Sequence, residues 1–414
     1  MALACAPFLF STRSVCGECQ DVYRRMAAII RGMYHFRTVV VLALFVVATS
    51  HVMSQANSPW QMQQSGTTAG LRGIDTIDSR IAWASGTEGT VLRTIDGGAK
   101  WQKCAVPDAA TDGATLDIRG IQAFNAQAAI VMASGPGDKS RLYKTTDGCR
   151  TWELLFKNPD TPDGFFDSFW FNGSDGMLLG DPVRGQLTVF KTANGGKSWK
   201  HDSHDGLSLH GRSLAAFAAS NSCIARGNRL FAQGIVTGGK DGAVLFSRLN
   251  FPDFDKSRGM IGKIGWKELG WKSIPVPVIA GTESSGAFSI GYRYPLTSGI
   301  CKDCGFGENS RLIAVGGDYS KPNESPGTAA WSADGGDHWT ASARPPHGYR
   351  SSVQWAEHLN AWITAGTNGS DISRDDGKTW QPLDDGNWNA LSLPFVVGPK
   401  GRIARLQTSY LNAK

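Results

Sequence analysis

Short apolar segments recur along most of the chain, and each is followed by a glycine-rich turn. In residues 71–101 the segments LRGIDTI, RIAWASG and TVLRTIDGGAKW alternate apolar with polar or small residues. Such runs between turn signals predict β-strands. Similar triplets begin near residues 118, 167, 286 and 351. Four short strands in a unit of about 40 to 50 residues are typical of one blade of a β-propeller.

Five of the turns share the pattern Ser/Thr-x-Asp-x-Gly-x-x-Trp, with small deviations. The Asp side chain can accept hydrogen bonds from backbone N–H groups of its own turn, and glycine takes the positive-φ position. We therefore expect the acidic residue to stabilise the turn rather than to act in catalysis, and the Trp to open the next strand. The five pairs are Asp96 and Trp101, Asp147 and Trp152, Asn194 and Trp199, Asp334 and Trp339, and Asp375 and Trp380.

Two further units lack this turn. In the fourth unit we expect strands at 212–217, 229–239 and 243–247, then an insertion over roughly residues 248–265 before Trp266. The last unit offers three strands between residues 389 and 406, and residues 58–65 supply a Trp-led fourth strand. Joining the two ends leaves no open sheet edge. The sequence thus predicts an all-β, seven-bladed β-propeller over residues 57–414. Its outer strands are opened by Trp60, Trp101, Trp152, Trp199, Trp266, Trp339 and Trp380.

The first 56 residues are expected to lie outside this fold. Residues 33–56 contain Arg37, an apolar run at 38–48, and the small residues of Ser54-Gln55-Ala56, which together predict a secretory signal peptide. Residues 1–32 are interpreted as a leader or a mis-called start. The apolar run is short for a membrane span, so we expect export to the periplasm or the extracellular space, with an uncleaved anchor as the alternative.

Charge and cysteine content narrow the choice of partners. Residues 57–414 keep 37 of the 42 basic and 34 of the 36 acidic side chains, a surplus too small to predict nucleic-acid binding. We expect a monomer without cofactor or metal. The pair at positions 301 and 304 is interpreted as a local loop disulfide rather than a redox or zinc pair. An odd number of cysteines leaves at least one thiol free or paired between chains. The five that follow the cleavage site are Cys104, Cys149, Cys223, Cys301 and Cys304.

The repeated turns resemble the Asp box, or BNR repeat, of the YVTN/BNR-like superfamily. Within it the chain is similar to the photosystem II stability/assembly factor-like family over residues 58–410. The segments GDPVRGQL, SSGAFSIGY, VGGDY, GYRSSV and GPKGRIARL are like those of a bacterial branch. The resemblance implies a seven-bladed propeller and, by analogy with members from phototrophs, a chaperone-like assembly protein that binds membrane-protein partners. A shared fold does not by itself establish a shared function.

Four arginines are candidates for binding at the channel mouth, where the innermost strands of a propeller begin. Arg72, Arg119, Arg212 and Arg350 align at the start of these strands. Guanidinium groups pair with carboxylates in a bidentate manner, so we expect an anionic group there, from a protein segment or a carbohydrate. The alternative is that each arginine is bound to a local acid, such as Asp75 or Asp117, and stabilises the ring.

A glycoside hydrolase, sialidase-like or xyloglucanase-like, is the alternative function. Two positioned carboxylates are needed, and Asp181 and Asp318 are the candidates. Tyr319, or else Tyr292 or Tyr349, is a candidate sialidase nucleophile. The Phe-Arg-Ile-Pro motif expected of sialidases is absent, and those enzymes usually have six blades. An oxidoreductase finds no support, because no GxGxxG opens a helix and no CxxCH occurs. We favour a non-catalytic binding or assembly module of the cell envelope.

Overall fold

The computed structural model describes residues 58–202, 206–226, 232–253, 265–268, 270–293 and 310–412. Residues 59–414 form one compact unit. The predicted leader and signal peptide, and the Cys301–Cys304 pair, lie outside the described residues. Within them, no helix is both long enough and apolar enough to cross a membrane.

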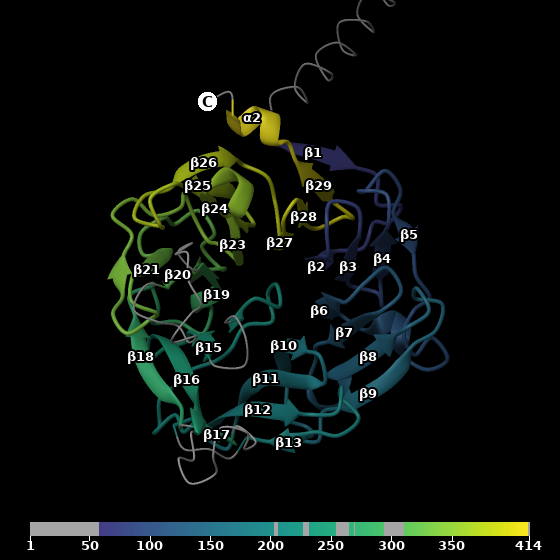
Figure 1. The fold of residues 1–414 in the computed structure, drawn as a ribbon, viewed down its shortest axis with the longest axis horizontal. Coiled ribbons are helices and arrows are strands. Elements are labelled where there is room, and N and C mark those ends of the chain that lie inside the picture. The colour runs from purple at the N-terminus through teal and green to yellow at the C-terminus, as the bar shows by residue number, and fades with distance from the viewer. Residues whose placement is uncertain are drawn as a thin grey trace, which may run out of the picture. The chain divides into compact units, whose positions relative to one another are not determined.

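Seven antiparallel sheets surround a central channel, so the predicted seven-bladed β-propeller is confirmed (Figure 1). Five blades consist of four consecutive strands each. Blade one contains β2 (Leu71–Thr76), β3 (Ala82–Gly86), β4 (Val91–Thr94) and β5 (Gln102–Lys103). Blade two contains β6 (Ile118–Ala123), β7 (Ala129–Ala133), β8 (Arg141–Thr145) and β9 (Glu153–Lys157). Blade three contains β10 (Phe166–Asn172), β11 (Asp175–Val183), β12 (Gln186–Thr192) and β13 (Lys200–His201). Blade five contains β19 (Ser285–Arg293), β20 (Arg311–Asp318), β21 (Ala329–Ser332) and β22 (Thr340–Ala341). Blade six contains β23 (Ser352–Ala356), β24 (Ala361–Gly366), β25 (Gly369–Ser373) and β26 (Gln381–Asp384).

Blade seven joins the two ends of the described chain. It contains β27 (Ala390–Ser392), β28 (Phe395–Val397), β29 (Ile403–Leu406) and β1 (Trp60–Gln63), followed by the short helix α2 (Thr408–Asn412). Strand β1 runs antiparallel to β29, with Trp60 opposite Leu406. The indole Nε1 of Trp60 donates to Oγ of Ser370 in blade six at 2.9 Å. Closure of the ring by the N-terminal strand is therefore confirmed.

Blade four differs from the prediction in its first and last strands. It contains β14 (Ile224–Arg226), β15 (Ala232–Thr237), β16 (Ala243–Asp253), β17 (Gly265–Glu268) and β18 (Lys272–Val276). Residues 212–217 contribute only a single bridge, from Ala215 to Gly238. The outer strand of the blade is β18, which pairs with the first half of β16 and follows the buried Trp271. Trp266 lies in β17, a hairpin extension on the far half of β16. The insertion repeats a Trp-led pattern, which is why the wrong tryptophan was assigned.

Five turns between third and fourth strands have the same hydrogen bonds. In blade one, the N–H of Gly98 donates to Oγ1 of Thr94 at 2.9 Å, and Oδ1 of Asp96 accepts the N–H of Lys100 at 3.0 Å. The bonds from Lys100 and Thr94 lower the pKa of Asp96. Asn194 can take the place of Asp in blade three, since its Oδ1 accepts the N–H of Ser198 in the same way. These side chains are therefore engaged within their own turns.

A disulfide joins two neighbouring blades. Cys149 lies at the second glycine position of the turn in blade two, with a φ of 66°. It bonds to Cys104, directly after β5 of blade one, with the two Cα atoms 5.3 Å apart. Cys223 is a free, buried thiol. Cys149 has a backbone conformation that favours glycine, and the disulfide links it to the adjacent sheet.

Candidate binding site at the channel mouth

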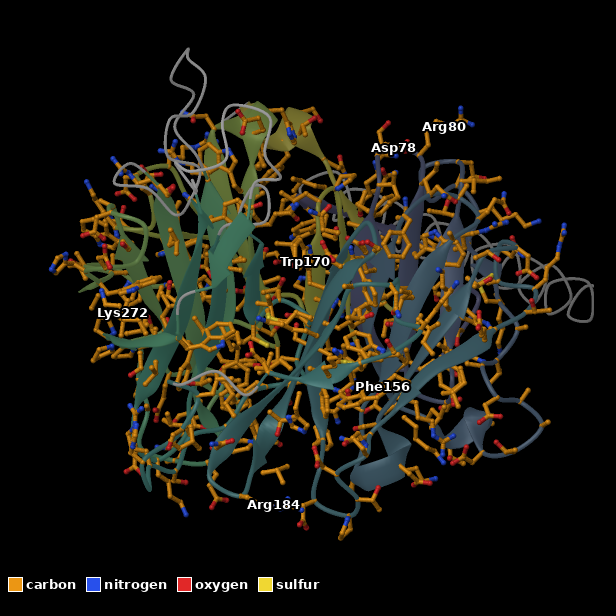
Figure 2. The ribbon with its side chains drawn as sticks, turned by 60° about the horizontal axis from the view of Figure 1, so that its bottom comes forward. Asp78, Arg80, Phe156, Trp170, Arg184 and Lys272 are labelled. Carbon is orange, nitrogen blue, oxygen red and sulfur yellow. A yellow bond between two sulfur atoms is a disulfide. The ribbon has the colours of Figure 1, made fainter. Side chains whose placement is uncertain are left out.

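The turns divide the blades into two faces. Turns between first and second strands lie at the same end as the five Asp turns, whereas first strands begin at the opposite end. Figure 2 shows this separation: Asp78 and Arg80, between β2 and β3, lie at one end, and Arg184, between β11 and β12, lies at the other. The end where first strands begin is called the mouth below.

Four blades carry a β-bulge within the first four residues of the first strand. The pairing register shifts by one residue at Arg72, Arg119, Asp167 and Phe288 in blades one, two, three and five. A bulge changes the direction of one side chain and ends regular pairing. The four bulged residues therefore occupy equivalent places at the mouth.

Arg72 and Arg119 share one carboxylate. Nε of Arg119 lies 2.8 Å from Oδ2 of Asp117, and Nε of Arg72 lies 3.5 Å from Oδ1 of the same residue. The two arginine side chains remain 37% and 32% exposed. Two guanidinium groups facing one carboxylate leave a positive charge and unused N–H donors at the surface. Such a pair can accept a second carboxylate from a ligand.

A buried pair of carboxyl groups lies beside the arginines. Asp167 is 1% exposed, and Asp181, near the end of the second strand, interacts with it. Burial raises the pKa of Asp181 to about 6. Burial and then the charge of Asp181 raise the pKa of Asp167 well above its usual range, and Arg119 opposes this rise. Two carboxyls in such a place hold a proton to a higher pH than exposed ones.

A loop of blade four closes the channel at this level. After the bridge at Ala215, residues 216–221 leave the sheet where the other blades have a single bulged residue. We call these residues the plug. The N–H groups of Ala216 and Ala218 donate to the carboxyls of Asp181 and Asp167. In Figure 1 a teal loop, the colour of this part of the chain, reaches inside the ring between β19 and β10.

The plug and its continuation bond to four other blades. Oγ of Ser220 donates to the carbonyl of Ser351 in blade six at 2.6 Å. Oδ1 of Asn221 accepts the N–H of Phe169 in blade three at 2.8 Å, and its amide reaches blade two. Ser222 donates to Oγ of Ser289 in blade five at 2.7 Å. These bonds anchor the plug across the channel.

Aromatic rings form another part of the mouth. Phe217 of the plug stacks on Phe288 with ring centroids 3.8 Å apart, and Tyr349 meets Phe288 edge-on at 4.9 Å. Burial raises the pKa of Tyr349, and the nearby Arg72 opposes the rise. Tyr319 is 54% exposed and packs edge-on to the same Phe288. The mouth thus combines an exposed basic pair with an aromatic side.

Arg350 and Arg212 do not join the basic pair. The Arg350 side chain is fully buried, where it pairs with Asp371 and donates to the carbonyl of Tyr349. Blade six has no bulge, because β23 pairs with β24 without a register shift. A strand without the extra residue of a bulge directs the preceding side chains to the other side of the sheet. Arg350 therefore points into the protein interior, beside Asp371. Arg212 precedes the bridge of blade four, and its Nε donates to the carbonyl of Leu209 at 3.2 Å.

Asp318 and Asp181 have opposite protonation tendencies. Burial raises the pKa of Asp318, but bonds from Ser320, Ser284 and Thr282 outweigh it, so the pKa is lowered overall. Asp318 therefore holds a turn and is a weak proton donor. The charge of Asp181 acts on the nearby Asp167, and Oδ1 of Asp181 is buried without a hydrogen-bond partner. Neither state matches an exposed acid and base that face one glycosidic bond. Among the described residues, no group of three or more His, Cys, Asp or Glu is placed to hold a metal.

Two mouth residues, Asp167 and Phe288, did not emerge from the sequence as site residues. Each of the two is the bulged residue of its first strand, as Arg72 is in blade one. The segment Asp167-Ser-Phe could have been aligned with Arg72-Gly-Ile. A motif restricted to arginine could not find them. The plug has no motif, because its position depends on the tertiary contacts of blade four.

Comparison with known proteins supports the fold. No protein-family model matches the chain, and no curated protein matches it. Among solved structures, the chain is similar to YCF48 bound to a D1 peptide, with 18% identity and a TM-score of 0.52 over 84% of this chain and 97% of that one. It is also similar to YCF48 from Cyanidioschyzon merolae, with 16% identity and a TM-score of 0.52 over 84% of this chain and 99% of that one. At this identity the likeness establishes a shared seven-bladed architecture.

Proposed function

We propose that this chain is an exported, non-catalytic binding or assembly module whose mouth recognises an acidic segment of a protein partner. The observation that carries this proposal is the shared carboxylate: Arg72 and Arg119 both pair with Asp117, and both remain about one-third exposed. A partner carboxylate would complete the charge balance. The similar YCF48 structure holds a peptide, by its description, which supports a protein ligand for this fold.

The disulfide supports export. The Cys104–Cys149 bond is of a kind that persists in oxidising compartments and is rare in the cytosol. It agrees with a signal peptide over residues 33–56 and with a periplasmic or extracellular protein. We expect the exported form to be a monomer that binds no nucleic acid.

Binding of a fluorescently labelled Glu-rich peptide, with its Gln-containing counterpart as the control ligand, tests the proposed function. Replacing both Arg72 and Arg119 with Ala should weaken binding at least about tenfold, because charged hydrogen bonds contribute about 1.5–3 kcal/mol each. Asp117→Asn should tighten it, since the competing carboxylate is removed. Fluorescence anisotropy measures both effects, and circular dichroism verifies the fold.

Arg80→Ala is the matched control, because this exposed arginine lies at the opposite end of the molecule (Figure 2). It should leave the affinity unchanged. Equal binding by the double variant and the parent protein would exclude the mouth as the site.

A further inference from the structure

The channel contains a cavity beyond the plug. Its volume is about 550 Å³, and Ser220, Asn221 and Ser222 form its inner end. It extends along the first strands to Glu357, an exposed residue in the turn after β23. The cavity therefore opens at the face opposite the mouth. Its size falls within the range of about 300–1,000 Å³ typical of small-molecule sites.

Aliphatic side chains form the wall of the cavity. Six of the seven blades each contribute one from the first strand, and a ring of this kind favours the methylene groups of a ligand. The six residues are Ile74, Ile121, Ile224, Ile290, Val353 and Leu391.

The charges on the lining are mainly acidic. Asp75 and Glu357 contribute two carboxylates. Arg293 is the one basic residue among the described residues of the lining, and Asp376 binds it in a bidentate manner at 2.8 and 2.6 Å. Its guanidinium also lies 4.6 Å from the centre of the Trp355 ring. Asp376 is shared, because it also lies 3.6 Å from Nε of Arg311. The described part of the lining itself holds two carboxylates and one guanidinium, so the field in the cavity attracts cations more than anions.

We propose that this cavity binds a small organic cation with an unbranched aliphatic body, such as a primary alkylamine. The ammonium group is attracted by Asp75 and Glu357, and the chain packs against the aliphatic wall. The plug separates this ligand from the mouth, where the surplus charge is positive. The two sites therefore select ligands of opposite charge, and this inference does not depend on the proposed function.

Isothermal titration of the exported form with hexylamine, hexanol and hexanoate tests the charge preference. Hexylamine should bind most tightly and hexanoate least. Within the series from butylamine to hexylamine, each methylene should tighten binding about fourfold. Hexanoate binding as tightly as hexylamine, or no saturable binding of hexylamine to the folded protein, would overturn the proposal.

Isosteric variants locate the site. Asp75→Asn keeps an oxygen that can accept the N–H of Ala123, and Glu357→Gln keeps one for the indole of Trp355. The two substitutions together should weaken hexylamine binding at least tenfold. Asp78→Asn, which removes an exposed carboxylate from the same face (Figure 2), and Arg119→Ala at the mouth should change nothing. Unchanged binding in the double variant would place the amine elsewhere and refute the assignment.

Discussion

The exposure and the pKa of a side chain at the mouth depend on its interaction partners more than on its residue type. Arg119 lies in the first strand of blade two and Arg350 lies just before the first strand of blade six, yet one is partly exposed and the other is fully buried. The two acids Asp181 and Asp318 both lie in the last three residues of second strands, yet burial raises the pKa of Asp181 and hydrogen bonds lower the pKa of Asp318. These differences arise from neighbours that are distant in sequence.

Asp181→Asn should remove a pH dependence of stability. The folded-state pKa of Asp181 is about 6, against a usual 3.8, so its contribution is fully present below pH 4 and is lost as the pH rises through about 6. The parent protein should lose roughly 2–3 kcal/mol of unfolding free energy over that interval. The variant should show a smaller loss, because only Asp167 remains to be ionised in the buried place, and at pH 7 it should melt at the same temperature as the parent or higher.

Thermal unfolding between pH 4 and pH 7 measures this effect. Asp318→Asn is the comparison, because the contribution of Asp318 to stability changes with pH in the opposite direction. The lowered pKa of Asp318 means that its contribution is present above its unfolded pKa and is lost as the pH falls. A parallel pH profile for the parent and Asp181→Asn would contradict the buried pair.

The turn residues could be predicted from the sequence, whereas the mouth could be predicted only in part. Asp96 and Asn194 were expected to stabilise turns because their bonds are local, and the structure gives both such bonds. Arg72 and Arg119 were placed correctly at the start of first strands, with Asp117 as a possible partner. Asp167 and the burial of Arg350 depend on strand register, which a single bulged residue changes.

At the level of elements, the plug replaces a bulge and acts as an internal brace. Asn221 has a φ of 58° and accepts bonds from the N–H of Phe169 and the hydroxyl of Ser168. The plug has no regular structure, but its sequence has the apolar pattern of a strand. That similarity explains why the first strand of blade four was predicted too early.

Asn221→Ala should lower the free energy of unfolding by about 2–4 kcal/mol. The substitution leaves a buried N–H without its acceptor and places a Cβ residue at positive φ without the local stabilisation of Asn. Asn221→Gly removes the same bonds but tolerates the backbone, so it should be less destabilising by about 1 kcal/mol. Urea denaturation compares the three proteins. Equal stability of the parent and Asn221→Ala would show that the plug does not brace the ring.

For the whole molecule, ring closure makes the two ends of the propeller interdependent. Seven blades could be counted from the sequence because the Trp-led turns repeat, and residues 58–65 could be assigned to the last sheet because they repeat the outer strand. The exception was Trp266, where an insertion carries a second tryptophan five residues before Trp271.

Trp60→Ala should destabilise the entire propeller by about 3–5 kcal/mol, because a buried indole is removed from the closing strand. Met62→Ala in the same strand is the control, since Met62 is 41% exposed and should cost far less. Urea unfolding followed by tryptophan fluorescence measures both. Similar losses in the two variants would mean that β1 contributes little to closing the ring.

Site-specific photocrosslinking tests the proposed binding face most directly. A photoreactive phenylalanine at position 319, beside the mouth and 54% exposed in the parent, is irradiated with the Glu-rich peptide, and position 80 at the opposite end serves as the reference. We predict crosslinking at position 319 that is lost when Arg72 and Arg119 are replaced, and none at position 80. Crosslinking at position 80 alone, or at position 319 regardless of the arginines, would contradict recognition of an acidic partner by the basic pair.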